Sequence, residues 1–210
     1  DKGKKVGEWR TGYENGARKS VELYKNNRRS GTATGWYANG VKKSEQRFVD
    51  GRPDGAHTSW YENGEAKSLD TFKAGAKDGE AMTGYDNGQK KAEGAFKDDK
   101  KHGLWKEWFS SGQQKSEAVY NMGAREGAFA DWHANGKQWA IGSFKIVEEE
   151  GQQTSVESGS CAAMLDSGEK SSTVDFNARK LTVYGRDGGL LVSAASNEAK
   201  KWYDKNQAVY

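Results

Sequence analysis

The sequence predicts a mainly β protein: an elongated single-layer antiparallel meander of six 24-residue β-hairpin repeats with a small mixed C-terminal cap. Two glycine series and an Asn-Gly pair (Ser-Gly in one unit), which closely follows an aromatic residue or a histidine, recur without an insertion. Strict repetition of this length is typical of stacked arrays. The glycine series are Gly7, Gly31, Gly55, Gly79, Gly103, Gly127 and Gly151, and Gly16, Gly40, Gly64, Gly88, Gly112 and Gly136.

Each unit is predicted to be one hairpin that turns at Asn-Gly, because both residues of a two-residue turn take positive φ. In the first unit, residues 7–14 would then pair with residues 17–24. We expect the link to the next unit to contain one left-handed residue. That residue is Asn27, Gly51, Gly75, Asp99 or Gly123.

The predicted register sorts the side chains onto two faces. The first face receives two or three rings from each of the first five units, such as Tyr37 and Phe48 in the second. It also places the first glycine of a unit opposite the second ring, as with Gly31 and Phe48 or Gly103 and Tyr120. We therefore expect a bulky residue at these glycines to collide with the aromatic ring.

The second face is predicted to carry a row of indoles with lysines directly across each strand pair. The indoles are Trp36, Trp60, Trp108 and Trp132, and their expected partners are Lys43, Lys67, Lys115 and Trp139. Glycines at 12 and 84 interrupt the row. Two interpretations stay open: cross-strand pairs that only stabilise a thin sheet, and a docking surface, since Trp is enriched at binding hot spots.

Composition excludes several classes of protein. Of the 210 residues, 34% are hydrophobic and 30% are charged, which is too few apolar residues for a thick two-layer core. Aromatic residues nevertheless reach 11%. The net charge of +3 is spread among mixed signs, so no nucleic-acid partner is expected. No apolar run approaches the roughly 20 residues that span a bilayer. The start at Asp1 fits a processed export signal or a shortened chain, and we expect an exported or cell-envelope bacterial protein.

The repeated skeleton Gly-x-Trp-x-x-Trp-Tyr-x-Asn-Gly-x-x-Lys-Ser-Glu-x-x-Phe-x-x-Gly resembles the bacterial, YwqK-like form of the MORN repeat, over about 150 of the 210 residues. The first and sixth units depart from this skeleton. In the first unit, Gly12 replaces Trp and Asn27 replaces Gly; in the sixth, His133, Trp139 and Val147 replace Tyr, Lys and Gly. The resemblance implies a scaffold for proteins or membranes. The antitoxin label of YwqK-like proteins implies a toxin-neutralising role.

The regular pattern ends near residue 150, so we predict a repeat array over 1–150 and a capping segment over 151–210. Residues 146–165 are interpreted as a link or a degenerate seventh unit. A hairpin with its turn at Asp187-Gly188 and a short helix from Ser196 should follow. A strand of this tail is expected to cover the edge beside the sixth hairpin.

The sequence predicts no catalytic, cofactor or metal site. His57, His102 and His133 occupy three different repeat phases, and Cys161 stands apart from them. Scattered carboxylates give no acid and base pair. The predicted function is a non-catalytic scaffold that binds another protein through the second face. Membrane-surface or glycan recognition and toxin neutralisation are the alternatives.

Overall fold

A computed structural model describes residues 3–149, 152–164, 170–175, 180–184 and 190–195. The chain divides into two units, Asp1–Gly112 and Gln113–Tyr210. Within the described ranges every regular element is a β-strand, and none of them forms a helix that could cross a membrane. The predicted mainly β class is therefore confirmed.

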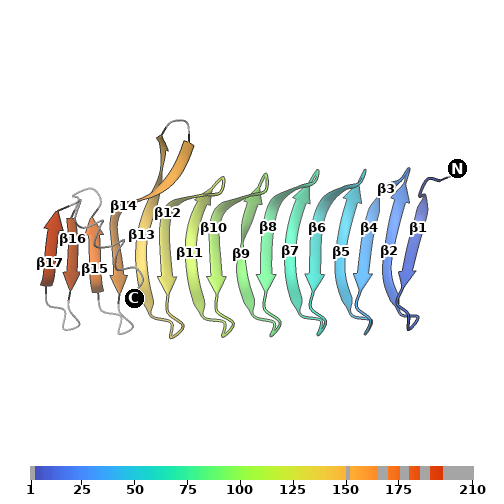
Figure 1. Ribbon diagram of the computed structural model, residues 1–210, viewed down its shortest axis with the longest axis horizontal. Coiled ribbons are helices and arrows are strands. Elements are labelled where there is room, and N and C mark those ends of the chain that lie inside the picture. The colour runs from blue at the N-terminus through green and yellow to red at the C-terminus, as the bar shows by residue number, and fades with distance from the viewer. Residues whose placement is uncertain (1–2, 150–151, 165–169, 176–179, 185–189, 196–210) are drawn as a thin grey trace. The chain divides into compact units, whose positions relative to one another are not determined.

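The first unit is an antiparallel meander in which strands adjacent in sequence pair side by side (Figure 1). A short strand, β3, also pairs with β2. The strands are β1 (Gly7–Gly12), β2 (Arg18–Lys25), β3 (Arg28–Arg29), β4 (Gly31–Trp36), β5 (Lys42–Val49), β6 (Arg52–Trp60), β7 (Ala66–Lys73), β8 (Ala76–Gly84), β9 (Lys90–Lys97) and β10 (Lys100–Trp108). Each pair of strands on either side of an Asn-Gly turn forms one predicted hairpin.

The second unit continues the same pattern in chain order. Its strands are β11 (Gln114–Asn121), β12 (Ala124–Trp132), β13 (Gln138–Glu149), β14 (Gln152–Met164), β15 (Lys170–Asp175), β16 (Lys180–Tyr184) and β17 (Leu190–Ala195). The interpretation of residues 146–165 as a link is wrong, because residues 146–149 form the end of β13 and residues 152–164 form β14. The predicted strand beside the sixth hairpin is confirmed, since β14 pairs with β13.

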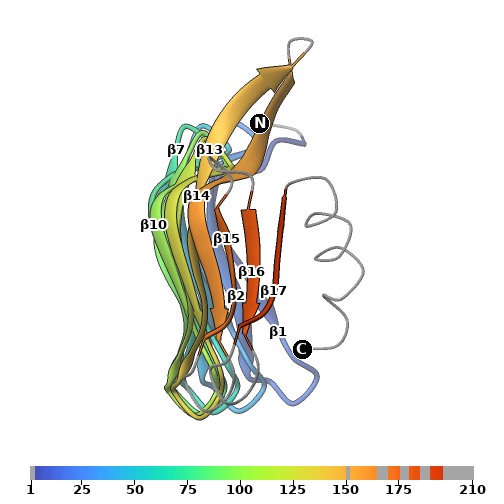
Figure 2. The ribbon, with the colours of Figure 1, turned by 90° about the vertical axis from the view of Figure 1, so that its left-hand side faces the viewer.

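The β13–β14 hairpin extends beyond its neighbour β12 (Figures 1 and 2). The pairing of β12 with β13 stops at Phe144, whereas β13 and β14 stay paired as far as Glu149 and Gln152. The strands of the predicted hairpin near the C-terminus are confirmed as β16 and β17. Its Asp187-Gly188 turn and the helix predicted from Ser196 lie outside the described residues.

The Asn-Gly turns are three-residue loops, not the two-residue turns predicted. In the first hairpin the Tyr13 N–H donates to the Ala17 carbonyl at 2.8 Å, and the Gly16 N–H donates to the Tyr13 carbonyl at 3.0 Å. Only Gly16 has positive φ, at 82°. The asparagine stabilises the loop through its side chain, because Asn15 Oδ1 accepts a hydrogen bond from the Ala17 N–H at 3.0 Å. This geometry is a type I turn followed by a left-handed glycine.

The link turns are the two-residue turns with positive φ at both positions. Ala74 and Gly75, with φ of 51° and 102°, join the paired residues Lys73 and Ala76. The same geometry occurs at Asn26-Asn27, Asp50-Gly51, Asp98-Asp99 and Met122-Gly123. The predicted left-handed residues of the links are confirmed, but each has a left-handed residue before it.

We expect Ala74→Gly to stabilise the protein by about 1 kcal/mol, because a Cβ is strained at positive φ and glycine relieves that strain. Chemical unfolding measures the difference. Ala38→Gly is the matched control: Ala38 is exposed in an Asn-Gly loop and has no left-handed φ. Equal effects of the two substitutions would contradict the assigned turn geometry.

The three-residue loop leaves a bulge that shifts the pairing near it by one residue. Gly35 pairs with Ser44, but Trp36 pairs with Lys42, so that Lys43 is the extra residue. The expected pairing of Trp36 with Lys43 is therefore wrong. The same shift replaces the expected partners of Trp60 and Trp132 by Ala66 and Gln138.

The expected collision at the first glycine series is also wrong. Gly31 does pair with Phe48, as predicted. A Cβ on Gly31 would instead meet Leu23 Cδ1 at 3.0 Å, and one on Gly103 would meet no atom within 4 Å. Gly31 has φ of 84°, so its left-handed backbone, not room for a ring, favours glycine here.

The most buried side chains of the first unit lie along the middle of the first face. Trp105 is 8% exposed, and its Nε1 donates to the Ala95 carbonyl at 2.9 Å. Its ring meets Phe96 edge-on, with 5.0 Å between centroids. The ring also covers Gly94, where a Cβ would come within 2.4 Å of it. Gly94 thus provides the space that the largest buried side chain of this unit occupies.

Candidate interaction site: indole and lysine rows

The second face of the first unit carries Trp36, Trp60 and Trp108, each half-buried. Each indole lies against a cation from the preceding hairpin, where an exposed cation–π contact contributes roughly 0.5–1 kcal/mol. The distances to the ring centroids are 4.7 Å from Arg18 Cζ to Trp36, 5.3 Å from Lys42 Nζ to Trp60 and 5.7 Å from Lys90 Nζ to Trp108. Indoles and cations of adjacent hairpins therefore alternate along this face.

At Gly84 the row lacks both the indole and the cation that would lie on it. Where Gly84 replaces the indole, Ala66 replaces the cation of the preceding hairpin. A Cβ on Gly84 would lie 2.2 Å from the Ala66 carbonyl oxygen, so the two strands are too close here for a side chain. Within the first unit, the gap separates Trp36 and Trp60 from Trp108, as the sequence predicts.

Two of the lysines predicted to face the indoles lie on tyrosines instead. Lys43 Nζ is 5.4 Å from the centroid of Tyr37, and Lys67 Nζ is 5.5 Å from that of Tyr61. Lys19 and Lys91 make the same contact with Tyr13 and Tyr85, at 5.4 and 5.6 Å. The bulge is the physical reason, because it shifts the strand register by one residue. Lys42, and not Lys43, therefore lies in the indole row.

In the second unit, Trp132 is half-buried and Lys115 is exposed. Trp139 is 41% exposed and does not pair with Trp132. Its ring lies 6.3 Å from that of His133, tilted by 47°. Trp139 and His133 thus stand where the first four hairpins have lysine and tyrosine, and a ring contact replaces the cation–π contact.

The tyrosines also fasten each hairpin to the next, a role that the sequence reading missed. The hydroxyls of Tyr13, Tyr37, Tyr61 and Tyr85 donate to the carbonyls of residues 36, 60, 84 and 108 at 2.7 to 3.0 Å. Asn39 Nδ2 adds a bond to the Glu62 carbonyl at 3.0 Å. The signal in the sequence is the use of Tyr, which has a hydroxyl, in these four units where Phe would fill the same space.

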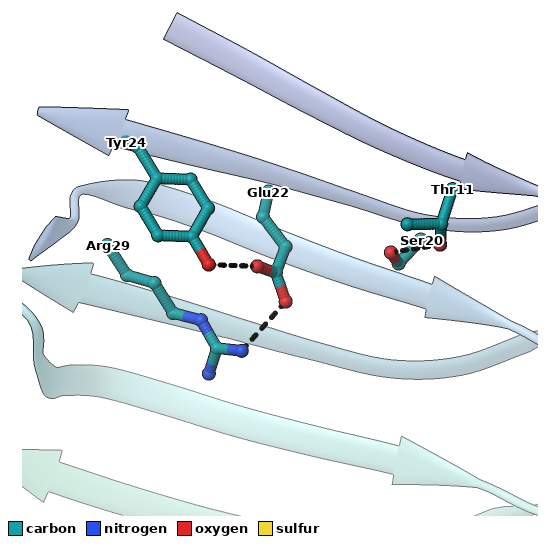
Figure 3. A network of polar contacts seen from close by, with 5 residues as sticks. All are labelled: Thr11, Ser20, Glu22, Tyr24 and Arg29. Atoms are coloured by element: carbon teal, nitrogen blue, oxygen red, sulfur yellow. Dashed lines mark hydrogen bonds and ion pairs between the residues drawn. The ribbon is translucent and has the colours of Figure 1, made fainter. Parts of the chain in front are cut away.

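The first face carries a polar network at the start of the array (Figure 3). Glu22 accepts hydrogen bonds from the Tyr24 hydroxyl at 2.5 Å and from Arg29 Nη2 at 2.8 Å. The contact with Tyr24, together with Glu22, raises the pKa of Arg29. The Arg29 guanidinium also lies 5.2 Å from the Phe48 ring. Nearby, the Thr11 and Ser20 hydroxyls lie 2.7 Å apart.

The described part of the chain contains His57, His102, His133 and Cys161. There, no three His, Cys, Asp or Glu side chains come together to hold a metal ion. The His57 ring lies 6.1 Å from the Phe72 ring, tilted by 51°. Burial raises the pKa of the Cys161 thiol, whose Sγ lies against Gly142. A raised pKa lowers the thiolate fraction at neutral pH and disfavours nucleophilic chemistry.

These features define a β-hairpin repeat protein with a half-buried aromatic row and cations that lie on it. The sequence family described as the MORN repeat variant matches residues 101–122, slightly less than one 24-residue repeat. The recurrence of the same skeleton along the chain supports a MORN-repeat protein. MORN repeats are generally non-enzymatic modules that bind proteins or membranes.

No curated protein sequence matches the chain. One similar solved structure is titled "Crystal Structure of TcdB2-TccC3-Cdc42", with 10% sequence identity and a TM-score of 0.17. The alignment covers 89% of this chain and 14% of the chain in that structure. A TM-score this low supports no conclusion about fold or function.

Proposed function

We propose that the chain is a non-catalytic repeat scaffold that binds another protein through its second face. Trp36, Trp60 and Trp108 anchor the partner, and the cations that lie on them supply polar contacts at the rim. Trp132 and Trp139 serve as anchors in the second unit. Aromatic and arginine side chains are the groups most enriched at protein-binding hot spots.

The observation that carries this proposal is the apolar content of the second face. Leu23 and Leu104 are 39% and 49% exposed, although burial would stabilise both of these apolar side chains. By strand alternation they share this face with the half-buried Leu69 and Met82. Exposed apolar side chains grouped with indoles mark interaction surfaces more often than isolated ones do.

Replacing Trp60 and Trp108 together by Ala should reduce partner capture at least about tenfold, since each hot-spot residue contributes 2 kcal/mol or so. Pull-down from the native source, quantified for each variant, is the measurement. Trp9→Ala is the matched control, because Trp9 is a 45% exposed indole on the first face and should leave capture unchanged.

Circular dichroism separates binding from folding. If the double variant unfolds, Leu104→Asp tests the same face at an exposed side chain that supports little packing. Capture that survives both the Trp double substitution and Leu104→Asp would refute the proposal.

Anionic membrane recognition is the second candidate, favoured by the pairing of cations with indoles at Trp36 and Trp60. Such pairs suit the boundary between headgroups and acyl chains. Flotation with vesicles containing phosphatidylserine would detect it. Flotation that depends on Trp60 and Trp108, with no protein captured, would assign the face to lipid. The toxin-neutralising role and glycan recognition remain proposals that the family resemblance and the aromatic composition suggest.

A further inference from the structure

The four lysines that lie on tyrosines form a second, separate row in the first unit. This lysine–tyrosine row consists of Lys19 on Tyr13, Lys43 on Tyr37, Lys67 on Tyr61 and Lys91 on Tyr85. All four lysines are exposed. Their contacts with the rings are nearly identical, at 5.4 to 5.6 Å. The row therefore presents one ammonium per hairpin in a constant setting.

These ammoniums differ in charge balance from the cations of the indole row. Lys42 pairs with Glu45 at 2.9 Å, and Lys90 pairs with Glu93 at 2.7 Å. Among the described residues, no carboxylate lies within ion-pair distance of Lys19, Lys43, Lys67 or Lys91. The ammoniums of the lysine–tyrosine row are thus not engaged in ion pairs with the described part of the chain.

The tyrosines hold this row in place. The Tyr37 hydroxyl is bonded to the carbonyl of residue 60 at 2.9 Å, and the Tyr61 hydroxyl to that of residue 84 at 3.0 Å. A ring fixed at both ends restricts the lysine that lies on it, which reduces the entropy cost of binding an anion there. An anionic partner therefore meets charges that are already arranged.

We propose that the lysine–tyrosine row binds an extended acidic polypeptide segment with a carboxylate at every third residue. Strands lie about 4.8 Å apart, so one hairpin advances the row by about 10 Å. A polyproline II helix has three residues per turn and advances about 9 Å per turn, so that side chains three residues apart lie on the same side of it. Acidic side chains three residues apart therefore match successive lysines.

The charges around the row favour a single chain over a flat anionic surface. Exposed Glu14, Glu62 and Asp86 lie in the Asn-Gly loops beside it. A membrane laid across this end of the sheet would meet these carboxylates together with the lysines, whereas a narrow chain that follows the row meets the lysines alone. The inference rests on the proposed function because the bound ligand is a protein segment. The side chains that bind it, however, are those of the lysine–tyrosine row and not the indoles.

The test uses two labelled peptides of equal composition. One has four consecutive Glu-Pro-Pro triplets, and the other has its four glutamates together, followed by the prolines. Fluorescence anisotropy with the full chain should show the spaced peptide bound at least about tenfold more tightly, with affinity falling as salt rises. Equal or tighter binding of the clustered peptide would overturn the inference, because charge alone would then explain attraction.

Substitutions locate the site. Changing Lys19, Lys43, Lys67 and Lys91 together to Gln should weaken spaced-peptide binding about tenfold or more, whereas the same four changes to Arg keep it. The matched control changes four exposed lysines beside the link turns to Gln: Lys25, Lys73, Lys97 and Lys100. Unchanged binding by the row variant, or equal loss in the control, would overturn the assignment.

Two further outcomes separate this inference from the proposed function. The Trp60 and Trp108 double variant should bind the spaced peptide as the wild type does. If that variant loses its protein partner while the peptide binds neither protein, the proposed function stands and the lysine–tyrosine row is not a site. Tighter binding of phosphatidylserine vesicles or single-stranded DNA than of the spaced peptide, lost in the Gln variant, would assign the row to another ligand and overturn the inference.

Discussion

Replacing Trp105 by Ala should destabilise the protein by about 3–5 kcal/mol, the usual cost of removing a buried aromatic side chain. Trp105 is 8% exposed, and its Nε1 hydrogen bond to the Ala95 carbonyl and its edge contact with Phe96 would be lost. The described strands of the first unit lie in one sheet, so few side chains outside that sheet are available to fill the space. Chemical unfolding followed by circular dichroism gives the free-energy change.

Trp9→Ala is the control for this substitution. Trp9 is 45% exposed and keeps only an edge contact with Tyr24, at 6.2 Å, and the cation of Lys5. We expect it to cost roughly 1 kcal/mol or less. Equal losses at Trp9 and Trp105 would show that burial on the first face does not determine stability.

Gly94→Ala should destabilise by about 2 kcal/mol, because the new Cβ would lie 2.4 Å from the Trp105 ring and force it away. Thermal unfolding and the emission maximum of tryptophan should change together, since the displaced indole gains solvent. In a Trp105→Leu background the cost should fall, because the smaller side chain leaves room.

Gly12→Ala provides the comparison for Gly94→Ala. A Cβ on Gly12 would meet the Ala17 carbonyl at an ordinary 3.5 Å, and neither glycine has a left-handed φ. Alanine costs less backbone entropy than glycine in a strand, so Gly12→Ala should be neutral or stabilising by up to about 1 kcal/mol. A neutral Gly94→Ala would contradict the packing of Trp105 on this glycine.

The 24-residue recurrence was enough to predict the hairpins and their order, because a repeat that cannot bury its own faces must pair with its neighbours. It also predicted the distant pairs, such as Gly31 with Phe48. The two-residue turns were predicted at the Asn-Gly pairs, but they lie in the links between hairpins. Asn-Gly favours a two-residue turn, but Asn39 Oδ1 accepts the Val41 N–H at 3.0 Å, which stabilises a three-residue loop.

That one-residue difference explains the error at the candidate site. A bulge near the loop changes the partner of each indole, and composition gives no sign of it. The sequence therefore placed Trp36, Trp60 and Trp108 in one row, but it paired Trp36 and Trp60 with the wrong lysines. The contacts between hairpins could not be predicted either, because the Tyr61 hydroxyl bonds to a backbone carbonyl of residue 84, which any side chain could supply.

The binding role of the second face can be tested most directly by photo-crosslinking from a single introduced side chain. A crosslinking amino acid at Leu104, on the second face, should yield one discrete protein adduct in the native source. The same amino acid at Thr83, exposed on the first face, should yield none. Adducts from Thr83 alone, or equally from both positions, would contradict a second-face interface.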